Sequence, residues 1–93
     1  MNEFFWFNRD IIRKPCFRNP LCTVVMITLA AEMDESNQTH EVSMLIRPIE
    51  QECRGVETAL QMLEEHGILQ RDTLHDCVQF DPQCVAYEAP KGA

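Results

Sequence analysis

The most constraining feature of the sequence is an apolar stripe with helical spacing that follows Pro48. Its members recur at positions i, i+4, i+7, i+11 and i+14: Ile49, Cys53, Val56, Leu60 and Leu63. This spacing places all of them on one face of an α-helix. Pro48 suits the first turn of that helix, and Gly67 in the segment "HGI" suits its end. The stripe predicts one amphipathic helix, which needs a second apolar surface to cover it.

Two segments before this helix have the composition of β-strands. Residues 22–31, "CTVVMITLAA", are short and rich in β-branched side chains, which favours a largely buried strand. Residues 40–47, "HEVSMLIR", alternate between apolar and polar side chains, as a half-buried strand does. Residues 33–39 between them concentrate Asp, Ser and Asn, which stabilise turns. The two segments are predicted to form a hairpin.

Two further short apolar segments follow the helix. "CVQF" (77–80) and "CVAY" (84–87) are separated by Asp-Pro-Gln, which is typical of a second hairpin. Residues 69–76 allow either a loop or one helical turn capped by Asp72. The order of elements predicts an α+β fold in which a four-stranded, mainly antiparallel sheet (ββαββ) carries one amphipathic helix on one face.

The chain has 93 residues, which is the size of one small domain. We expect a single domain over residues 1–93, with an N-terminal arm at 1–20 and the ββαββ body at 21–90. The arm contains four consecutive large apolar residues, Phe4, Phe5, Trp6 and Phe7. Leaving all four in water would expose an unusually large apolar patch. Either the arm folds back over the sheet as a further strand or short helix, or Trp6 and Phe7 belong to an interface with a partner or a second copy.

Charge is unevenly distributed along the chain. The net charge is −7, and residues 1–22 hold four basic and two acidic side chains, which gives +2 and leaves −9 on residues 23–93. An acidic body repels the phosphate backbone, so direct binding of nucleic acid is disfavoured. The negative potential of this acidic body favours a protein partner with a basic surface, including the nucleic-acid groove of another protein. The alternative is that the acidity only maintains solubility.

Two groups of acidic residues are candidate partner-binding residues. Asp34 and Glu35 are adjacent in the predicted turn, where they could also bind a divalent cation or act only as surface charge. The second group lies mostly on the polar side of the predicted helix: Glu50, Glu57, Glu64 and Glu65. Those side chains form either a solvated face or a recognition face.

The sequence lacks the standard enzyme motifs, including a nucleophile elbow, a phosphate loop and a His-Glu-x-x-His zinc motif. The best zinc candidates are His75, Cys77 and Cys84, with Cys16 or Cys22 as a fourth ligand, but their spacing is poor. Cys77 could also pair with His75 or His66 as a catalytic thiol. We expect no enzyme activity, no metal and no cofactor, and we expect the five cysteines to be reduced thiols.

No segment has the length of a membrane helix, because the longest apolar run is about half of the roughly 20 residues required. The start of the chain also lacks the charge and length of a signal peptide. We therefore expect a cytoplasmic protein that does not bind membranes.

One segment resembles a known enzyme family. Residues 19–48, "NPLCTVVMITLAAEMDESNQTHEVSMLIRP", are similar to the second and third sheet strands of DnaQ-like 3′–5′ exonucleases, and "EHGI" is similar to a His-Gly-Ile that often follows there. The catalytic strand of that family carries an Asp-x-Glu pair ahead of this segment. Residues 1–20 contain no such pair, so no catalytic or metal-binding residue is carried over. The resemblance implies at most a degenerate relative.

Size, acidity and the missing motifs favour a small acidic protein that binds and regulates or inhibits another protein. This profile is similar to that of small phage-encoded or bacterial inhibitors of nucleic-acid-handling machinery, such as anti-restriction and anti-CRISPR proteins. The alternative is a homo-oligomeric structural subunit of a larger assembly, for example a homodimer. A degenerate exonuclease relative or a small thiol or zinc protein is the third possibility.

Overall fold

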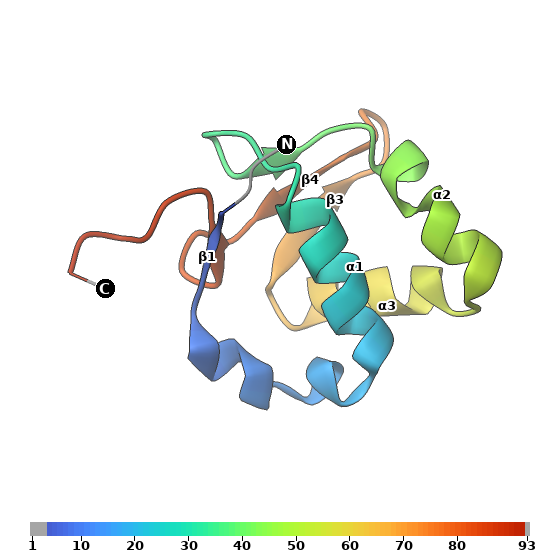
Figure 1. The fold of residues 1–93 in the computed structure, drawn as a ribbon, viewed down its shortest axis with the longest axis horizontal. Coiled ribbons are helices and arrows are strands. Elements are labelled where there is room, and N and C mark those ends of the chain that lie inside the picture. Colours follow the sequence, from blue (N-terminus) through green and yellow to red (C-terminus); the bar gives the residue numbers. More distant parts are fainter. Residues whose placement is uncertain (1–3, 93) are drawn as a thin grey trace.

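Three α-helices and two small antiparallel sheets make up the fold of residues 4–92, which are the residues that the computed structural model describes (Figure 1). The helices are α1 (Pro20–Ala30), α2 (Val42–Glu52) and α3 (Val56–Glu65). The predicted α+β class is confirmed. The prediction of one four-stranded sheet with a single helix is wrong, because two of the expected strands are helical and the strands are divided between two sheets.

Helix α1 occupies the segment for which the sequence analysis predicts a buried strand. The Asn19 side chain caps this helix by accepting the Leu21 N–H at 3.1 Å, and Pro20 takes the first helical position. Both are start signals for a helix, whereas β-branched residues lower helix propensity only slightly. A short apolar run does not by itself distinguish a buried strand from a buried helix. Here the capping residues and tertiary burial favour the helix.

Helix α2 replaces the second predicted strand, so the first predicted hairpin does not exist. The buried side chains Val42 and Ile46 are four residues apart, which is a helical spacing. The apparent alternation arose because Met44, which is exposed, lies between them. The resemblance to exonuclease strands loses its structural basis here, since both segments compared with strands are helices.

The long helix predicted from Pro48 is two helices. Pro48 lies inside α2, and the chain leaves the helical conformation at Cys53. Gly55 has a φ of 92° and precedes α3, so its conformational freedom allows the turn between the helices. The predicted end is confirmed: Gly67 has a φ of 74°, and the Ile68 N–H donates to the Leu63 carbonyl at 2.9 Å.

The larger sheet has the strand order β2-β4-β3, and all its pairs are antiparallel. Its strands are β2 (Gln38–Thr39), β3 (Leu69–Asp72) and β4 (Cys77–Phe80). The strand predicted at 77–80 is confirmed. Residues 69–76, for which the sequence allows a loop or a helical turn, form β3 and the turn to β4. The second predicted hairpin is wrong, because β5 (Val85–Ala86) pairs with β1 instead of β4.

The N-terminal arm folds back onto the body. Strand β1 (Trp6–Phe7) pairs antiparallel with β5, and the Asn8 N–H donates to the Cys84 carbonyl at 2.9 Å. Two 3-10 helices, Arg9–Arg13 and Pro15–Arg18, continue to α1 and bury Ile11 and Cys16. The prediction that the arm folds back is confirmed for these residues, but β1 joins β5 in a separate two-stranded sheet and does not extend the larger one. The first three residues of the predicted arm lie outside the described part of the chain.

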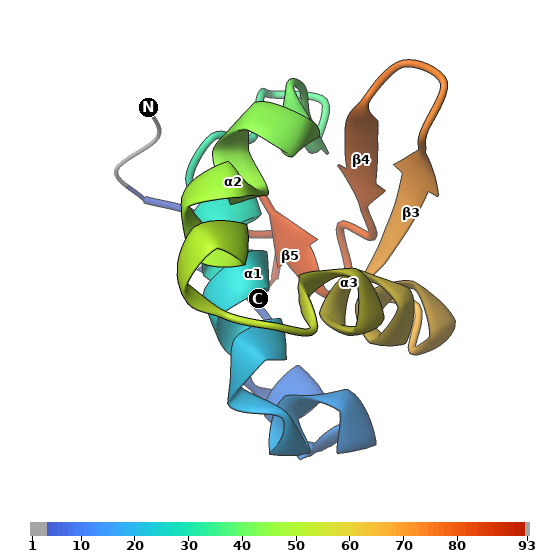
Figure 2. The ribbon, with the colours of Figure 1, turned by 90° about the vertical axis from the view of Figure 1, so that its right-hand side faces the viewer.

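The core lies between the helices and the larger sheet. Figure 2 shows α1 and α2 on one side of the molecule and β3 and β4 on the other. The largest fully buried side chains include Phe80, Leu29, Leu63, Ile68 and Leu69. All five cysteines are free, and Cys16, Cys22 and Cys84 are buried among these apolar side chains. None of the helices formed by residues 4–92 is long and apolar enough to cross a membrane.

Candidate functional site

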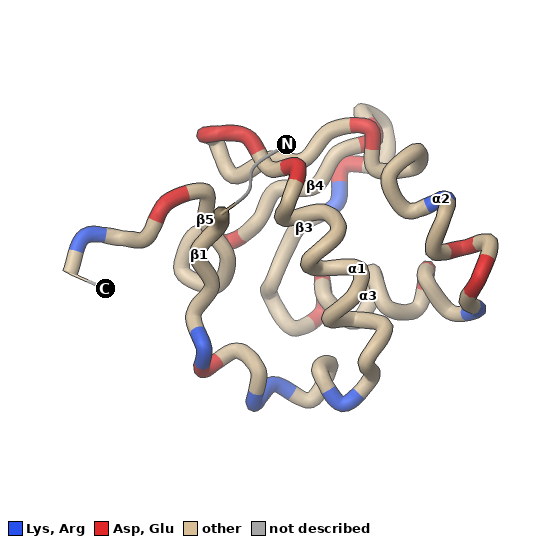
Figure 3. The backbone as a smooth tube through the Cα atoms, viewed as in Figure 1, with Lys and Arg blue, Asp and Glu red and all other residues tan. Residues whose placement is uncertain are grey.

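Acidic side chains gather on two neighbouring loops. We call this surface the acidic edge and define it by five residues: Asp34, Glu35, Glu41, Asp72 and Asp76. They lie in the stretches 34–41 and 72–76, neither of which contains a Lys or Arg. Figure 3 shows the acidic segments along the upper border of the view, whereas the basic segments of the N-terminal arm lie at the lower border. The acidic edge and the basic residues of the N-terminal arm therefore lie at opposite borders of the molecule.

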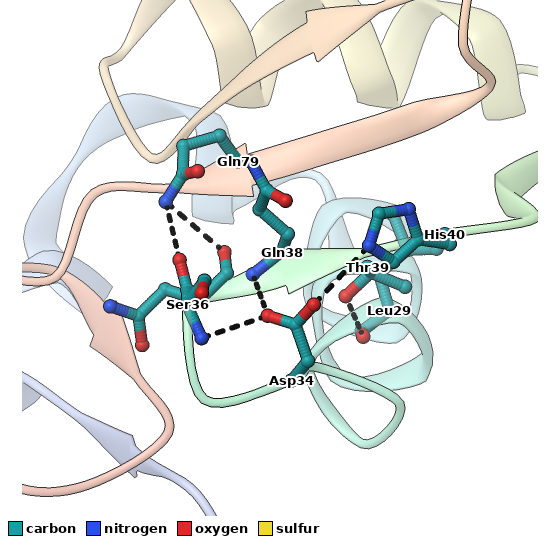
Figure 4. A network of polar contacts seen from close by, with 8 residues as sticks. Leu29, Asp34, Ser36, Gln38, Thr39, His40 and Gln79 are labelled. Atoms are coloured by element: carbon teal, nitrogen blue, oxygen red, sulfur yellow. Dashed lines mark hydrogen bonds and ion pairs between the residues drawn. The ribbon is translucent and has the colours of Figure 1, made fainter.

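Asp34 organises the first loop of the acidic edge. Its Oδ1 accepts the N–H groups of Ser36 at 2.9 Å and Gln38 at 3.0 Å, and its Oδ2 lies 3.2 Å from His40 Nε2 (Figure 4). The backbone N–H of Gln38 is the main reason why the pKa of the Asp34 carboxyl is lowered. Hydrogen bonds to the charged form favour ionisation. This loop therefore holds its carboxylate charged and in one orientation.

The same loop is attached to the core and to the larger sheet. The Thr39 hydroxyl is fully buried and donates to the Leu29 carbonyl of α1 at 2.7 Å. The Gln79 side-chain amide of β4 donates to the Ser36 carbonyl at 3.0 Å (Figure 4). The loop is thus fixed at both sides, by a helix and by a central strand.

The second loop of the acidic edge is the turn from β3 to β4. Asp72 accepts the backbone N–H of His75 at 3.1 Å, and its Oδ2 lies 2.7 Å from His75 Nδ1. The bond from the His75 side chain is the main reason for a lowered pKa of Asp72. Asp76 accepts the Ser43 hydroxyl at 2.7 Å and the Ser43 backbone N–H at 3.1 Å, so it caps the start of α2.

Pairing of β2 with β4 brings the two acidic loops together. The consequence is visible at Cys77, a partly buried thiol at the start of β4. Its pKa is raised, first by burial and then by the negative charges of Asp72, Asp76 and Asp34. Carboxylates from both loops are thus close enough to act on one side chain. The direction is opposite to that of an activated catalytic thiolate.

Comparison of the chain with protein-family models, with curated proteins and with solved structures finds no match.

The acidic residues predicted on the helix do not form one group. Glu57 and Glu64 of α3 hold Arg71 of β3: Arg71 Nη1 donates to Glu57 Oε1 at 2.7 Å, and the Arg71 backbone N–H donates to Glu64 Oε2 at 2.8 Å. Glu65 accepts a bond from Gln61 on the same helix. Glu50 is exposed near the end of α2, a different helix. Three of the four predicted helix acids therefore accept hydrogen bonds within the chain.

The other predicted site residues lie on separate surfaces. Asp34 and Glu35 belong to the acidic edge, as their adjacency in the sequence indicates. Trp6 is partly buried and Phe7 is exposed in β1, where the pairing with β5 fixes their backbone. The sequence analysis missed Glu41 and Asp76 and considered Asp72 only as a cap. The available signal was the density of Asp in the short segment "RDTLHD", which is typical of a turn between strands.

The zinc candidates are not assembled into a site. Within residues 4–92 no three His, Cys, Asp or Glu side chains are placed to hold a metal ion. His75 is engaged with Asp72 on the surface, whereas Cys84 is buried beside the Gly67 carbonyl. The ligands proposed from the sequence are therefore not arranged around a common point.

Replacing Asp34 by asparagine is expected to make stability less sensitive to acid. The pKa of Asp34 is lower in the folded protein than its ordinary value of 3.8, so its carboxylate stabilises the fold above that value. This contribution is lost as the pH falls through the folded-state pKa. Urea unfolding between about pH 6 and about pH 3 measures the change, which should be smaller in the variant than in the wild type.

Glu35→Gln provides the matched control, because it removes a neighbouring carboxylate that makes no hydrogen bond within the described residues. A loss of stability in acid that is equal in the wild type and in Asp34→Asn would contradict the role of the Asp34 network.

Proposed function

We propose that this protein binds another protein through the acidic edge and that its partner presents a surface rich in Lys and Arg. The observation that carries the proposal is the charge separation: five carboxylates occupy two adjacent loops that contain no Lys or Arg, in a chain of net charge −7. Such a surface attracts a basic partner over distances beyond direct contact and raises the rate of encounter.

The loops are ordered before any partner binds. Asp34 and Asp72 accept backbone N–H groups of their own loops, and Asp76 accepts the N–H of Ser43 at the start of α2. Glu35 and Glu41 are exposed between these anchors and make no side-chain hydrogen bond within the described residues. A preorganised surface loses less conformational entropy on binding. Glu35 and Glu41 are therefore the carboxylates best placed to contact a partner.

A surface hollow adjoins the acidic edge at Glu35. It has a volume of about 550 Å³, and its lining includes Glu35, Asn37, Tyr87 and Glu88. Two carboxylates and an aromatic ring suit the insertion of a Lys or Arg side chain, which gains both a salt bridge and a contact with the ring face. We assign this hollow to an anchoring basic side chain of the partner.

The nucleic-acid groove of another protein is the class of surface that fits best, because it presents a stripe of Lys and Arg that contacts phosphates. Occupation of such a groove would compete with nucleic acid. We therefore propose a regulator or inhibitor of a nucleic-acid-binding protein. The protein itself is not expected to bind duplex DNA at physiological salt, because its acidic body repels phosphates.

Reversal of Glu35 and Glu41 to lysine is expected to weaken partner binding at least about tenfold, mainly by slowing association. The wild-type chain is immobilised, proteins are captured from a nuclease-treated bacterial lysate, and their binding to both forms is measured by interferometry. Excess duplex DNA should release the captured partner, and the same DNA should not bind the immobilised protein alone.

Glu50→Lys/Glu52→Lys is the matched control. It changes net charge by the same amount at the exposed end of α2, outside the acidic edge. Captured partners that bind the Glu35→Lys/Glu41→Lys variant as tightly as the wild type would refute the acidic edge as the binding surface. Loss of binding only in the Glu50→Lys/Glu52→Lys control would assign the role to the end of α2, where Glu50 is one of the residues predicted from the sequence.

A further inference from the structure

Helix α1 exposes apolar side chains on the surface opposite the larger sheet. Its sequence is apolar almost all round, a property of helices that are buried on every side. Cys22, Val25 and Leu29 face the core. Val24 and Ile27 on the outer side remain 48% and 47% exposed. Figure 2 shows α1 behind α2, on the side of the molecule away from β3 and β4.

The exposed side chains of α1 and the partly exposed Ala31 that follows it form a continuous stripe. Pro20, Val24, Ile27 and Ala31 follow one another at i, i+4, i+7 and i+11, which places them on one face of the helix. No charged residue occurs between Asn19 and Ala31. The stripe ends in the small residues Pro20 and Ala31, which allow a second helix to approach closely. A stripe of this spacing is what helix pairing requires.

The two ends of α1 carry opposite charges. Arg18 precedes the helix and follows Arg13 and Lys14 of the basic arm, whereas Glu32 follows the helix. In Figure 3 the helix is uncharged along its length, with basic segments beyond its lower end and an acidic segment at its upper end. A parallel neighbour of the same sequence would place like charges together. An antiparallel neighbour would place Arg18 beside Glu32.

The register of such an antiparallel pair is consistent along the whole stripe. Val24 opposite Ile27 of the second copy and Pro20 opposite Ala31 share one twofold axis, because the spacings of the stripe read the same in both directions. Arg18 ends the 3-10 helix before α1 and Glu32 follows its last residues, so the two charges lie beyond opposite ends of the stripe. The apolar contacts and the charge contacts therefore select the same arrangement. Self-complementarity of this kind is the property of an interface with twofold symmetry.

We infer that α1 is the contact surface of an antiparallel homodimer, in which the stripe Pro20, Val24, Ile27 and Ala31 packs against the same stripe of a second copy. The charge complementarity between Arg18 and Glu32 favours a second copy over an unrelated protein. The contact involves one short helix from each chain, so we expect a dimer that dissociates on dilution. This inference is independent of the acidic edge, whose defining residues lie outside the stripe.

Sedimentation equilibrium of the full chain over a series of concentrations tests the dimer. Ile27→Glu is expected to weaken dimerisation at least about tenfold, because it places a charge in the centre of an apolar contact. Ile27→Thr keeps the branched shape at Cβ and should weaken the dimer as well. Met44→Glu introduces the same charge at an exposed apolar residue of α2 and should leave the dimer intact.

Charge exchange tests the antiparallel register. Arg18→Glu and Glu32→Arg should each weaken the dimer, because either change opposes like charges, whereas the combined variant should restore it. A wild-type chain that stays monomeric at the highest concentration would overturn the inference. A dimer unaffected by both Ile27 variants, or a combined charge variant that remains as weak as the single ones, would overturn it as well.

Discussion

Replacing Leu63 by alanine is expected to lower the free energy of unfolding by about 2–5 kcal/mol. Leu63 is fully buried on α3, in the cluster that joins the helices to the larger sheet. The change removes apolar contacts and leaves a cavity that close neighbours fill only in part. A domain of this size has a total stability of about 5–15 kcal/mol, so the variant should lose a large share of it. Urea unfolding monitored by circular dichroism measures the difference.

Leu74→Ala is the matched control for this experiment. Leu74 lies in the turn between β3 and β4 and is 86% exposed, so the same chemical change should alter stability by no more than about 0.5 kcal/mol. Equal losses in both variants would mean that Leu63 does not occupy the core position described above.

Replacing Ala59 by leucine is expected to cost about 1–3 kcal/mol, because the contact between α1 and α3 has no space for a larger side chain. Ala59 is fully buried, and the Cys22 thiol of α1 lies 3.7 Å from its carbonyl oxygen. A leucine would push the two helices apart or force a strained side-chain conformation. Thermal and urea unfolding measure the loss.

Thr58→Leu serves as the control for overpacking, since Thr58 precedes Ala59 on α3 but is exposed. It adds an apolar side chain of the same size without entering the contact with α1. A stability of Ala59→Leu equal to that of Thr58→Leu would show that the two helices are not closely packed there.

The α+β class and the helix end at Gly67 followed from the sequence, whereas α1 and α2 did not. Residues 22–31 combine β-branched side chains with a short apolar run, a pattern that is compatible with a strand and with a buried helix. Asn19 and Pro20 decide between the two, because a capping Asn followed by Pro starts a helix. In α2, the apolar Met44 lies between the buried Val42 and Ile46, so the sequence alternates as a strand would even though Met44 is exposed.

The acidic edge could be predicted only in part, for a different reason. Asp34 and Glu35 are adjacent in the chain, so their local concentration of charge is visible in the sequence. Asp72 and Asp76 join them only because β2 pairs with β4, and this pairing links residues about forty positions apart. Local patterns carry no information about such a contact. The same is true of Glu57 and Glu64, whose bonds to Arg71 depend on how α3 lies against β3.

Pairing of β1 with β5 has a consequence for synthesis of the chain. Trp6 lies opposite Ala86 and Phe7 opposite Val85. The first strand can therefore pair only after about eighty further residues have been synthesised. On a ribosome the aromatic side chains of β1 emerge early but gain their strand partner only when nearly all the described residues have been made. During that interval these side chains are a site for chaperone binding or aggregation, and slowing translation should prolong the exposure. The arm that closes the native fold is thus the last part of it to be secured.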